Sequence, residues 1–201
     1  MDPQNLSSLK KGLLTLVILT LFVPHSVAQL QKHDFKIGIG LFSSNFLYAV
    51  RDELLVDPGF GDYISKNIDG STGALYFSYR NYPIPKLSIG ATIGMERIKG
   101  DILIDGMAEG RYSSDFLAGA IEMDYLYLSK PHLQLYSGMG LGVAYCSESN
   151  QVFSSSETDD GVKFIYQLNV IGLRLGGIFG FFLEGGYGYR GIARAGINIM
   201  L

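Results

Sequence analysis

Apolar and polar residues alternate with a period of two along most of the chain after residue 34, as in β-strands that bury or expose one apolar face. The segment 35–42 places Phe35, Ile37 and Ile39 on one face and Lys36 on the other. The same pattern predicts eight strands, at 35–42, 72–80, 87–97, 116–128, 133–146, 162–175, 181–189 and 193–201. The predicted fold class is all-β, a closed antiparallel up-and-down barrel of about eight strands.

The connections between these strands alternate in length. Long polar loops are predicted at 43–71, 101–115 and 147–161, and short turns follow the second, fourth and sixth strands. This alternation is typical of outer-membrane barrels, whose long loops face outside and whose short turns face the periplasm. The short connection after residue 189 departs from the pattern.

The first 28 residues have the features of an export signal. Lys10 and Lys11 precede an apolar run at 13–23, and small residues follow at 26–28. The run is about eleven residues long, too short for the roughly 20 that a membrane-spanning helix needs. We therefore expect a signal peptide at 1–28, cleaved after Ala28, and a barrel domain at 29–201.

Charged residues provide a test of the barrel interpretation, because a Lys or Arg that faces lipid at mid-depth costs about 2–4 kcal/mol. When the lipid face of each strand is set from its apolar residues alone, most strand charges fall on the opposite face. This predicted luminal charge network has four cations and four anions: Lys36, Arg80, Arg190, Arg194, Glu96, Glu122, Asp124 and Glu184. Arg97 and Arg174 fall on the lipid face, at predicted strand ends where they can reach the headgroups.

Composition narrows the function classes. A single cysteine, Cys146, excludes an internal disulfide, and a net charge of −3 argues against a nucleic-acid partner. No apolar stretch after residue 28 is long enough for a spanning helix, so a membrane-integral chain would have to close into a barrel. Aromatic residues of the apolar face gather near strand ends, among them Tyr145, Tyr166 and Tyr189.

The end of the chain carries a family resemblance. The segments 166–168, 172–174 and 183–191 (Leu-Glu-Gly-Gly-Tyr-Gly-Tyr-Arg-Gly) lead to a closing strand at 195–201. With them the chain resembles small outer-membrane barrels of the OmpA/OmpX type, and most closely the generic outer-membrane β-barrel family of Bacteroidota. The resemblance implies outer-membrane lipid and the barrel-insertion machinery as partners. Such proteins usually end in an aromatic residue, whereas this chain ends in Leu201.

Catalytic chemistry is not predicted. Barrels of similar size that modify lipid A resemble hydrolases in needing a His near the outer rim, but His33 and His132 both fall at the periplasmic end of the predicted topology. Glu122 and Asp124 share a strand face and suggest acid–base work as an alternative, but an internal salt-bridge network is the preferred interpretation. We predict no enzyme activity, no catalytic residue, no cofactor and no metal site.

These observations favour an outer-membrane barrel with a lumen filled by side chains, because eight strands leave an interior just wide enough for them. Its expected role is structural or interactive, with a surface partner bound through the loops 43–71, 101–115 and 147–161. The alternative is a transporter or porin for small or apolar solutes, and a lipid-modifying enzyme is less favoured. A soluble lipocalin-like carrier would instead place the apolar face inside and the charges outside.

Overall fold

The computed structural model describes residues 33–54, 64–104, 107–152 and 155–201, and strands make up most of them. The predicted signal peptide at 1–28 lies outside these residues. Within them the structure has one helix and nine strands. The elements are β1 His33–Leu41, α2 Ser44–Leu54, β2 Ile64–Ser71, β3 Ala74–Ile84, β4 Leu87–Ile104, β5 Met107–Lys130, β6 Leu133–Val152, β7 Ser155–Gly176, β8 Phe179–Gly188 and β9 Ala193–Met200.

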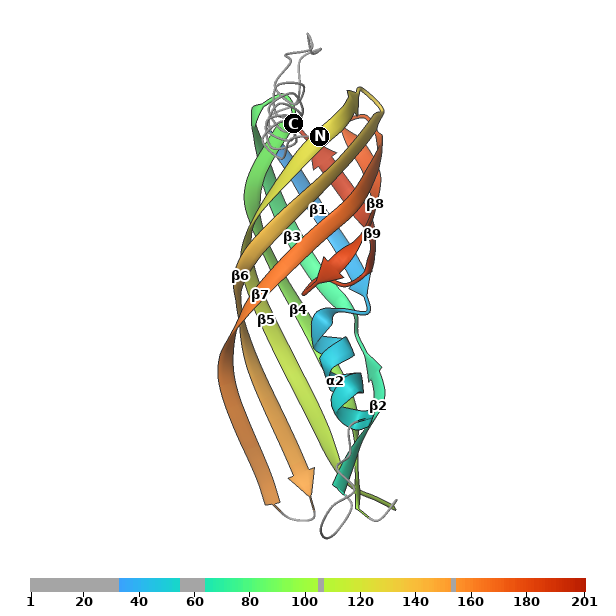
Figure 1. Cartoon of the computed structure of the whole chain (residues 1–201), viewed down its shortest axis with the longest axis vertical. Helices are drawn as coiled ribbons and strands as arrows, with labels where there is room; N and C mark the ends of the chain where they lie inside the picture. Colours follow the sequence, from blue (N-terminus) through green and yellow to red (C-terminus); the bar gives the residue numbers. More distant parts are fainter. Residues whose placement is uncertain (1–32, 55–63, 105–106, 153–154) are drawn as a thin grey trace, which may run out of the picture.

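Eight of the strands close into a ring. The strands follow the order β4-β3-β1-β9-β8-β7-β6-β5, and β5 pairs back with β4. Every pairing is antiparallel, as the sequence pattern predicts. His33 and Leu201 exchange two backbone hydrogen bonds where the described chain begins and ends. We call this the terminal end of the ring, and the opposite end, where α2 lies, the helix end (Figure 1).

Four strands continue past the ring at the helix end. β4 and β5 form one long hairpin, and β6 and β7 form another, whereas β8 and β9 stop at a short turn (Figure 1). The predictions of loops at 101–115 and 147–161 were therefore wrong, because the backbone ladders continue through Asp101↔Arg111 and Asn150↔Glu157. The long apolar alternation of the ring strands ends in these arms, although the backbone hydrogen bonding between the strands continues. A hydrophobic pattern in the sequence detects the alternation and not the hydrogen bonding.

The predicted loop at 43–71 was wrong for a different reason, because it contains α2 and β2. Ser43 is the N-cap of α2: its hydroxyl accepts a hydrogen bond of 3.0 Å from the Phe46 backbone N–H. β2 pairs with β4 at Ile98–Ile104, along the same edge as β3 and beyond the part that β3 occupies. Gly73, with a φ of +73°, lies between β2 and β3, and this conformation favours glycine.

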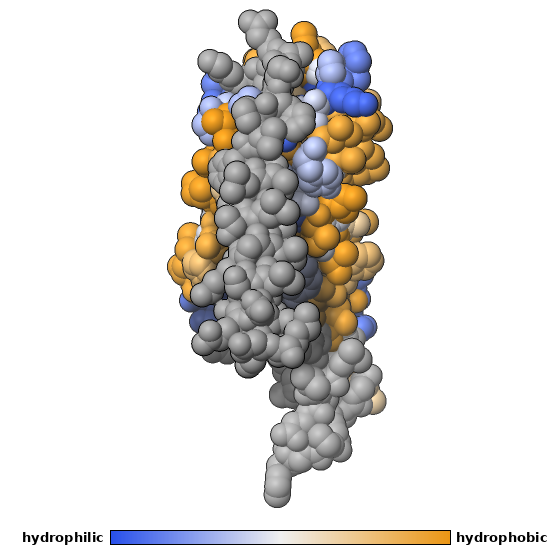
Figure 2. Space-filling view, turned by 45° about the horizontal axis from the view of Figure 1, so that its top comes forward, coloured by the Kyte–Doolittle hydropathy of each residue, from blue (hydrophilic) through white to orange (hydrophobic). Residues whose placement is uncertain are grey.

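The ring has an apolar outside and a polar inside. The outward side chains of β1 are exposed and its inward ones buried in strict alternation. Exposed fractions reach 61% at Ile93, 64% at Ile121 and 70% at Phe181, whereas Lys36 is only 2% exposed. Figure 2 shows apolar side chains along both flanks of the visible face of the ring. The described part of the chain contains no helix that is long and apolar enough to cross a membrane.

A β-bulge corrects the prediction for Arg174. The β7–β8 register shifts between Asn169 and Ile171, so Val170 and Ile171 are both exposed and the later residues change face. Arg174 is therefore buried, and its guanidinium donates hydrogen bonds to the backbone carbonyls of residues 176 and 177. Arg97 does lie outside, paired with Asp115, but β4 continues beyond it to Ile104.

Tyr189 was also assigned to the wrong face. It follows Gly188, which has a φ of +143°, and the chain there leaves β8 and turns inward, so Tyr189 is buried. Tyr145 and Tyr166 lie on the outside, as expected.

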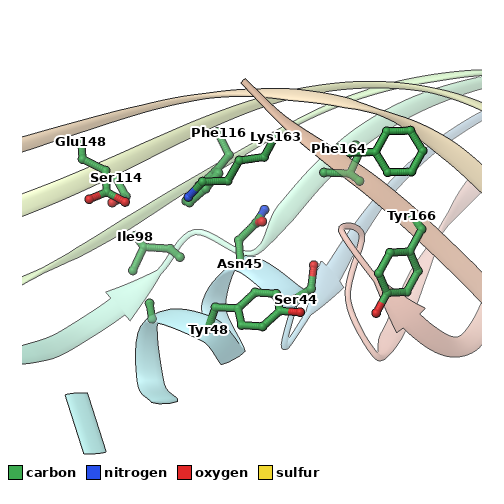
Figure 3. Close-up of a pocket in the computed structure, with 12 residues that line it drawn as sticks. Ser44, Asn45, Tyr48, Ile98, Ser114, Phe116, Glu148, Lys163, Phe164 and Tyr166 are labelled. Atoms are coloured by element: carbon green, nitrogen blue, oxygen red, sulfur yellow. The ribbon is translucent and has the colours of Figure 1, made fainter. Parts of the chain in front are cut away.

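An apolar cluster fills the inner side of the arms at the helix end. Ile98, Phe116 and Cys146 belong to it, and α2 packs against it through Phe46 and Ala49. A cavity of about 170 Å³ remains between α2 and the inner faces of β5, β6 and β7 (Figure 3).

Candidate functional site: the interior charge network and the helix anchor

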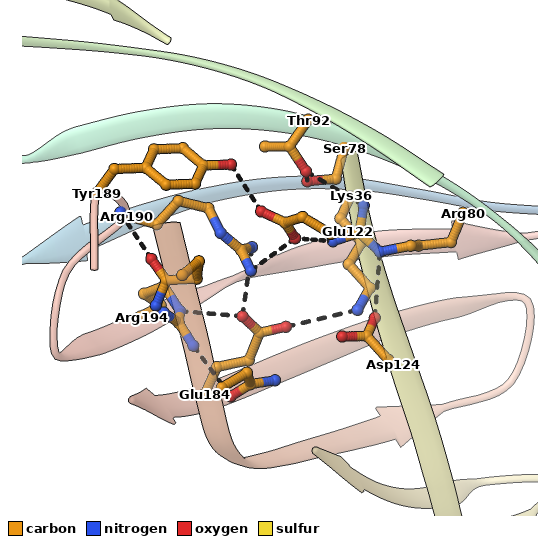
Figure 4. Close-up of polar contacts among 12 residues, drawn as sticks. Lys36, Ser78, Arg80, Thr92, Glu122, Asp124, Glu184, Tyr189, Arg190 and Arg194 are labelled. Atoms are coloured by element: carbon orange, nitrogen blue, oxygen red, sulfur yellow. Dashed lines mark hydrogen bonds and ion pairs between the residues drawn. The ribbon is translucent and has the colours of Figure 1, made fainter. Parts of the chain in front are cut away.

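The structure places all eight residues of the predicted luminal network inside the ring. None of these side chains belongs to a residue more than 6% exposed. They come from six strands and the β8–β9 turn: Lys36 from β1, Arg80 from β3, Glu96 from β4, Glu122 and Asp124 from β5, Glu184 from β8, Arg190 from the turn and Arg194 from β9. Seven of them form one connected chain of ion pairs (Figure 4).

Arg80 begins this chain by holding two carboxylates of β5. Its Nη2 pairs with Glu122 Oε2, and its Nε lies 3.1 Å from Asp124 Oδ2. Glu122 Oε2 also pairs with Arg190 Nη2 at 2.9 Å, and Glu122 Oε1 accepts a hydrogen bond of 2.6 Å from the Tyr189 hydroxyl. Both oxygens of Glu122 are thus engaged, which is the condition under which a buried carboxylate is tolerated.

Glu184 is the second centre of the network. Arg194 Nε lies 3.0 Å from Glu184 Oε2, and Arg190 Nη1 lies 3.4 Å from the same oxygen without hydrogen-bond alignment. On the other side, the Tyr136 hydroxyl donates a 2.7 Å hydrogen bond to Glu184 Oε1, and Lys36 Nζ lies 3.5 Å away. Glu184 therefore joins β1, β6, β9 and the β8–β9 turn across the lumen.

Two buried charged residues were missed by the sequence interpretation. Asp34 is fully buried; its Oδ1 accepts a 2.6 Å hydrogen bond from Asn198, and its Oδ2 lies 3.9 Å from Lys36 Nζ. Extending the alternation of the first strand by one residue would have found it. Arg174 was missed because the bulge is invisible in the pattern. With both included, the interior of the described chain holds five cations and five anions and is formally neutral.

Aromatic rings fill the space around the charges. Lys36 Nζ lies 4.5 Å from the centroid of the Tyr136 ring, and the Arg190 guanidinium lies 4.7 Å from that of Tyr76. A Cβ added at Gly38 would approach both Tyr76 and Phe182 closer than 3.0 Å. Glycines on the inner face thus make room for large neighbours, and the middle of the ring is packed with side chains.

Glu96 has a different role from the other seven residues. Its Oε2 accepts hydrogen bonds from the Ser43 hydroxyl at 2.6 Å and from Asn45 at 3.4 Å, and its Oε1 accepts one from Ser71 at 2.8 Å. Because Ser43 is also the N-cap of α2, Glu96 fixes the start of the helix to β4. A carboxylate beside the first turn also complements the positive end of the helix dipole.

The residues considered for catalysis are placed where they have structural partners. Glu122 and Asp124 both pair with Arg80 inside the network. His33 lies at the terminal end, with Nδ1 2.8 Å from the Tyr79 hydroxyl, and His132 lies in the β5–β6 turn at the same end. Among the described residues, no group of three or more His, Cys, Asp or Glu side chains is arranged to hold a metal ion.

No protein-family model, curated protein or solved structure matches this chain.

Proposed function

We propose that this chain is an integral outer-membrane β-barrel protein with a side-chain-filled lumen, which acts through the structures at its helix end. The observation that carries the proposal is the combination of a closed ring, an apolar exterior and a neutral buried charge network. A soluble carrier would need the reverse arrangement. In lipid, only a helix or a closed ring of strands satisfies every backbone hydrogen-bonding group.

The apolar surface has the height of a bilayer core. On β5, outward apolar positions run from Leu117 to Tyr127. These ten steps of about 3.4 Å, tilted by about 40°, span about 25 Å, the typical height of the apolar band of such barrels.

A polar row marks the limit of this band on the side of the helix end. Four register partners on adjacent strands form this row: Arg97, Asp115, Ser147 and Asp160. An apolar row that includes Leu117 lies next to it, on the side of the terminal end. Arg97 pairs with Asp115. Hydrogen bonds from the Ser147 and Tyr145 hydroxyls lower the pKa of Asp160, so this carboxylate stays ionised. A charged row at this level fits a boundary between lipid tails and headgroups, with the helix end outside the cell.

The filled lumen favours an interaction role over transport. A solute path along the axis would have to cross the ion pairs of Glu122 and Glu184 and the rings of Tyr76, Tyr136 and Phe182. Breaking such buried pairs costs several kcal/mol each. The exposed arms and α2 remain as the surfaces for contact with partners.

Cell fractionation tests the membrane assignment. We expect the protein in the outer-membrane fraction, with a mature N-terminus at Gln29, and with gel migration that changes on boiling because a closed ring resists detergent until heated. A soluble periplasmic protein whose migration does not depend on heating would refute the proposal.

Planar-bilayer recording tests the filled lumen. The purified protein is expected to give no reproducible channels, with a known open porin as the positive control in the same membranes. Uniform conductance steps in several independent preparations would favour the transporter alternative instead.

A further inference from the structure

The ring is incomplete beside α2. β8 pairs with β7 only from Gln167 onward, and the Tyr189 backbone N–H donates to the Tyr166 carbonyl where that pairing ends. Toward the arm, β7 is paired with β6 alone among the described strands. This part of β7 is therefore a sheet edge, and α2 lies across from it (Figure 3).

The 170 Å³ cavity lies between this edge and the helix. Its inner wall includes Ile98, Phe116 and Ala49, which belong to the apolar cluster or pack against it. Its lining also includes Phe164 and Tyr166, whose side chains are 72% and 44% exposed on the outside of the ring. The cavity therefore opens sideways across β7 rather than along the axis, in the two apolar rows that follow the row of Tyr145 and Val162 toward the middle of the ring.

Three tyrosines hold this opening in shape. Tyr187 on β8 is hydrogen-bonded through its side chain to Tyr48 on α2 and Tyr166 on β7, and its ring centroid lies 6.1 Å from that of Tyr166. Together with the Ser43–Glu96 contact, they fix α2 at both sides of the cavity. The lining also includes the polar residues Ser44, Asn45 and Ser114, so polar groups lie beside the apolar inner wall. Small-ligand sites likewise combine apolar walls with polar groups that orient the ligand.

The cavity lining contains one cation, Lys163, and one carboxylate, Glu148. Lys163 is part of the lining, and its Nζ lies 6.0 Å from the centroid of the Phe116 ring. Within the described part of the chain, no carboxylate forms an ion pair with Lys163. The other charged residue of the lining, Glu148, has an interaction of its own. The cavity thus joins an apolar interior to an available positive charge.

We propose that this cavity binds an anionic single-chain amphiphile that enters from the outer leaflet. The alkyl end occupies the space between Phe116, Ile98 and Ala49, and the acid group lies at Lys163. An enclosed apolar cavity of about 150 Å³ holds a benzene molecule, so this one takes a segment of similar size and leaves the rest of the chain in the opening. The inference rests on the proposed membrane location.

Fluorescence quenching can test the site cleanly because the chain contains no tryptophan. Phe164→Trp places a single reporter at the opening, and Phe181→Trp places a reference reporter on the outside of the ring near the terminal end. Each variant is inserted into phosphatidylcholine vesicles and titrated with 8-bromooctanoate, whose bromine quenches indole. Both reporters will show quenching proportional to the probe dissolved in the bilayer, and only the Phe164→Trp protein is expected to show an additional saturable component.

Two further changes, each made in the Phe164→Trp protein, separate the cavity from the surface. Ala49→Phe fills the cavity and should abolish the saturable component, whereas Ser149→Phe, which adds the same ring to the outward face of β6, should keep it. Lys163→Gln leaves the apolar walls intact and should weaken half-saturation about threefold, as expected for one partly exposed charge contact. A bromoalkyl trimethylammonium probe should show no saturable component.

Two controls make the outcome decisive. In stopped-flow mixing, entry from the bilayer requires the saturable component of the Phe164→Trp protein to develop after the bilayer quenching that the Phe181→Trp protein records; a saturable component that comes first would overturn the lateral route. Heat-dependent gel migration is measured on the same samples. A heat-dependent shift without saturable quenching refutes the binding site alone, and loss of the shift in the parent protein refutes the membrane barrel.

Discussion

Glu122 is the single residue on which most of the interior contacts depend. It pairs with Arg80 and Arg190 and accepts a hydrogen bond from the Tyr189 hydroxyl, so that two strands, β3 and β5, and the β8–β9 turn meet at one carboxylate. Removing one partner from a buried ion pair leaves a charge without compensation, and this loss is larger than the net contribution of the intact pair.

Glu122→Gln is therefore expected to lower the free energy of unfolding by about 3 kcal/mol, measured by urea unfolding in lipid vesicles. Asp115→Asn is the matched control on the same strand. Its partner Arg97 lies outside the ring, and both side chains are about half exposed, so the change should leave the unfolding midpoint nearly unchanged. Equal effects of the two variants would contradict the central role of Glu122.

Gly40 offers a second test at the residue scale. A Cβ at this position would overlap the carbonyl oxygen of Arg190, a backbone atom that cannot move without disturbing the β8–β9 turn. Gly40→Ala is expected to reduce strongly the fraction of protein that folds into vesicles, as measured by the heat-dependent gel shift. Gly119→Ala, where a Cβ meets nothing within 4 Å, should fold like the parent protein.

The phase of each strand was enough to place single residues correctly where the strand is regular. The apolar residues at odd spacing in the same strands predict that three charged residues face inward, and all three are buried: Lys36, Glu122 and Glu184. The same reasoning failed at Arg174, because one extra residue at the bulge reverses the phase and leaves no mark in the hydrophobic pattern. The pairing partners inside the lumen depend on the closed geometry and could not be predicted from one strand at a time.

At the scale of elements, α2 is held by its first turn. Ser43 caps the helix and also donates a hydrogen bond to Glu96, so one hydroxyl links the helix to the ring. The helix was not predicted, since 43–71 also contains Pro58 and several glycines that indicate a loop. The Ser43 cap followed by a segment without Pro or Gly to Leu54 was the available signal.

Ser43→Ala removes both contacts and is expected to destabilise α2 by about 1 kcal/mol. Amide hydrogen exchange should accelerate in α2, while the amides of β5 and β6 within the ring keep the exchange rates of the parent protein. Ser44→Ala, one residue later, keeps the cap and should exchange like the parent protein. Unchanged exchange in Ser43→Ala would show that packing by Phe46 and Ala49 alone holds the helix.

At the scale of the whole molecule, ring closure and the arms are separate features. The ring needs the apolar band and the paired edges, and β1 completes it by pairing with β9 along eight residues. The closed antiparallel order was predictable because the apolar alternation and short turns specify it. The arms were not, because their outward faces are largely polar and the few apolar residues of their inner faces, such as Ile102 and Tyr112, form no alternation as long as a strand.

Shortening one arm should therefore leave the ring intact. Residues 148–159 can be replaced by Asn-Gly, a two-residue hairpin turn, because Ser147 and Asp160 are already register partners. The shortened protein is expected to insert into vesicles and to keep its heat-dependent gel shift, since the apolar row at Tyr145 and Val162 is unchanged. Removing residues 193–201 is the contrasting deletion. It leaves the edges of β1 and β8 without partners. If the ring lies in lipid, as proposed, unpaired backbone groups there cost several kcal/mol each. No folded band is expected from that deletion, and if both proteins lost the gel shift, the arms would have to be counted as part of the folding unit.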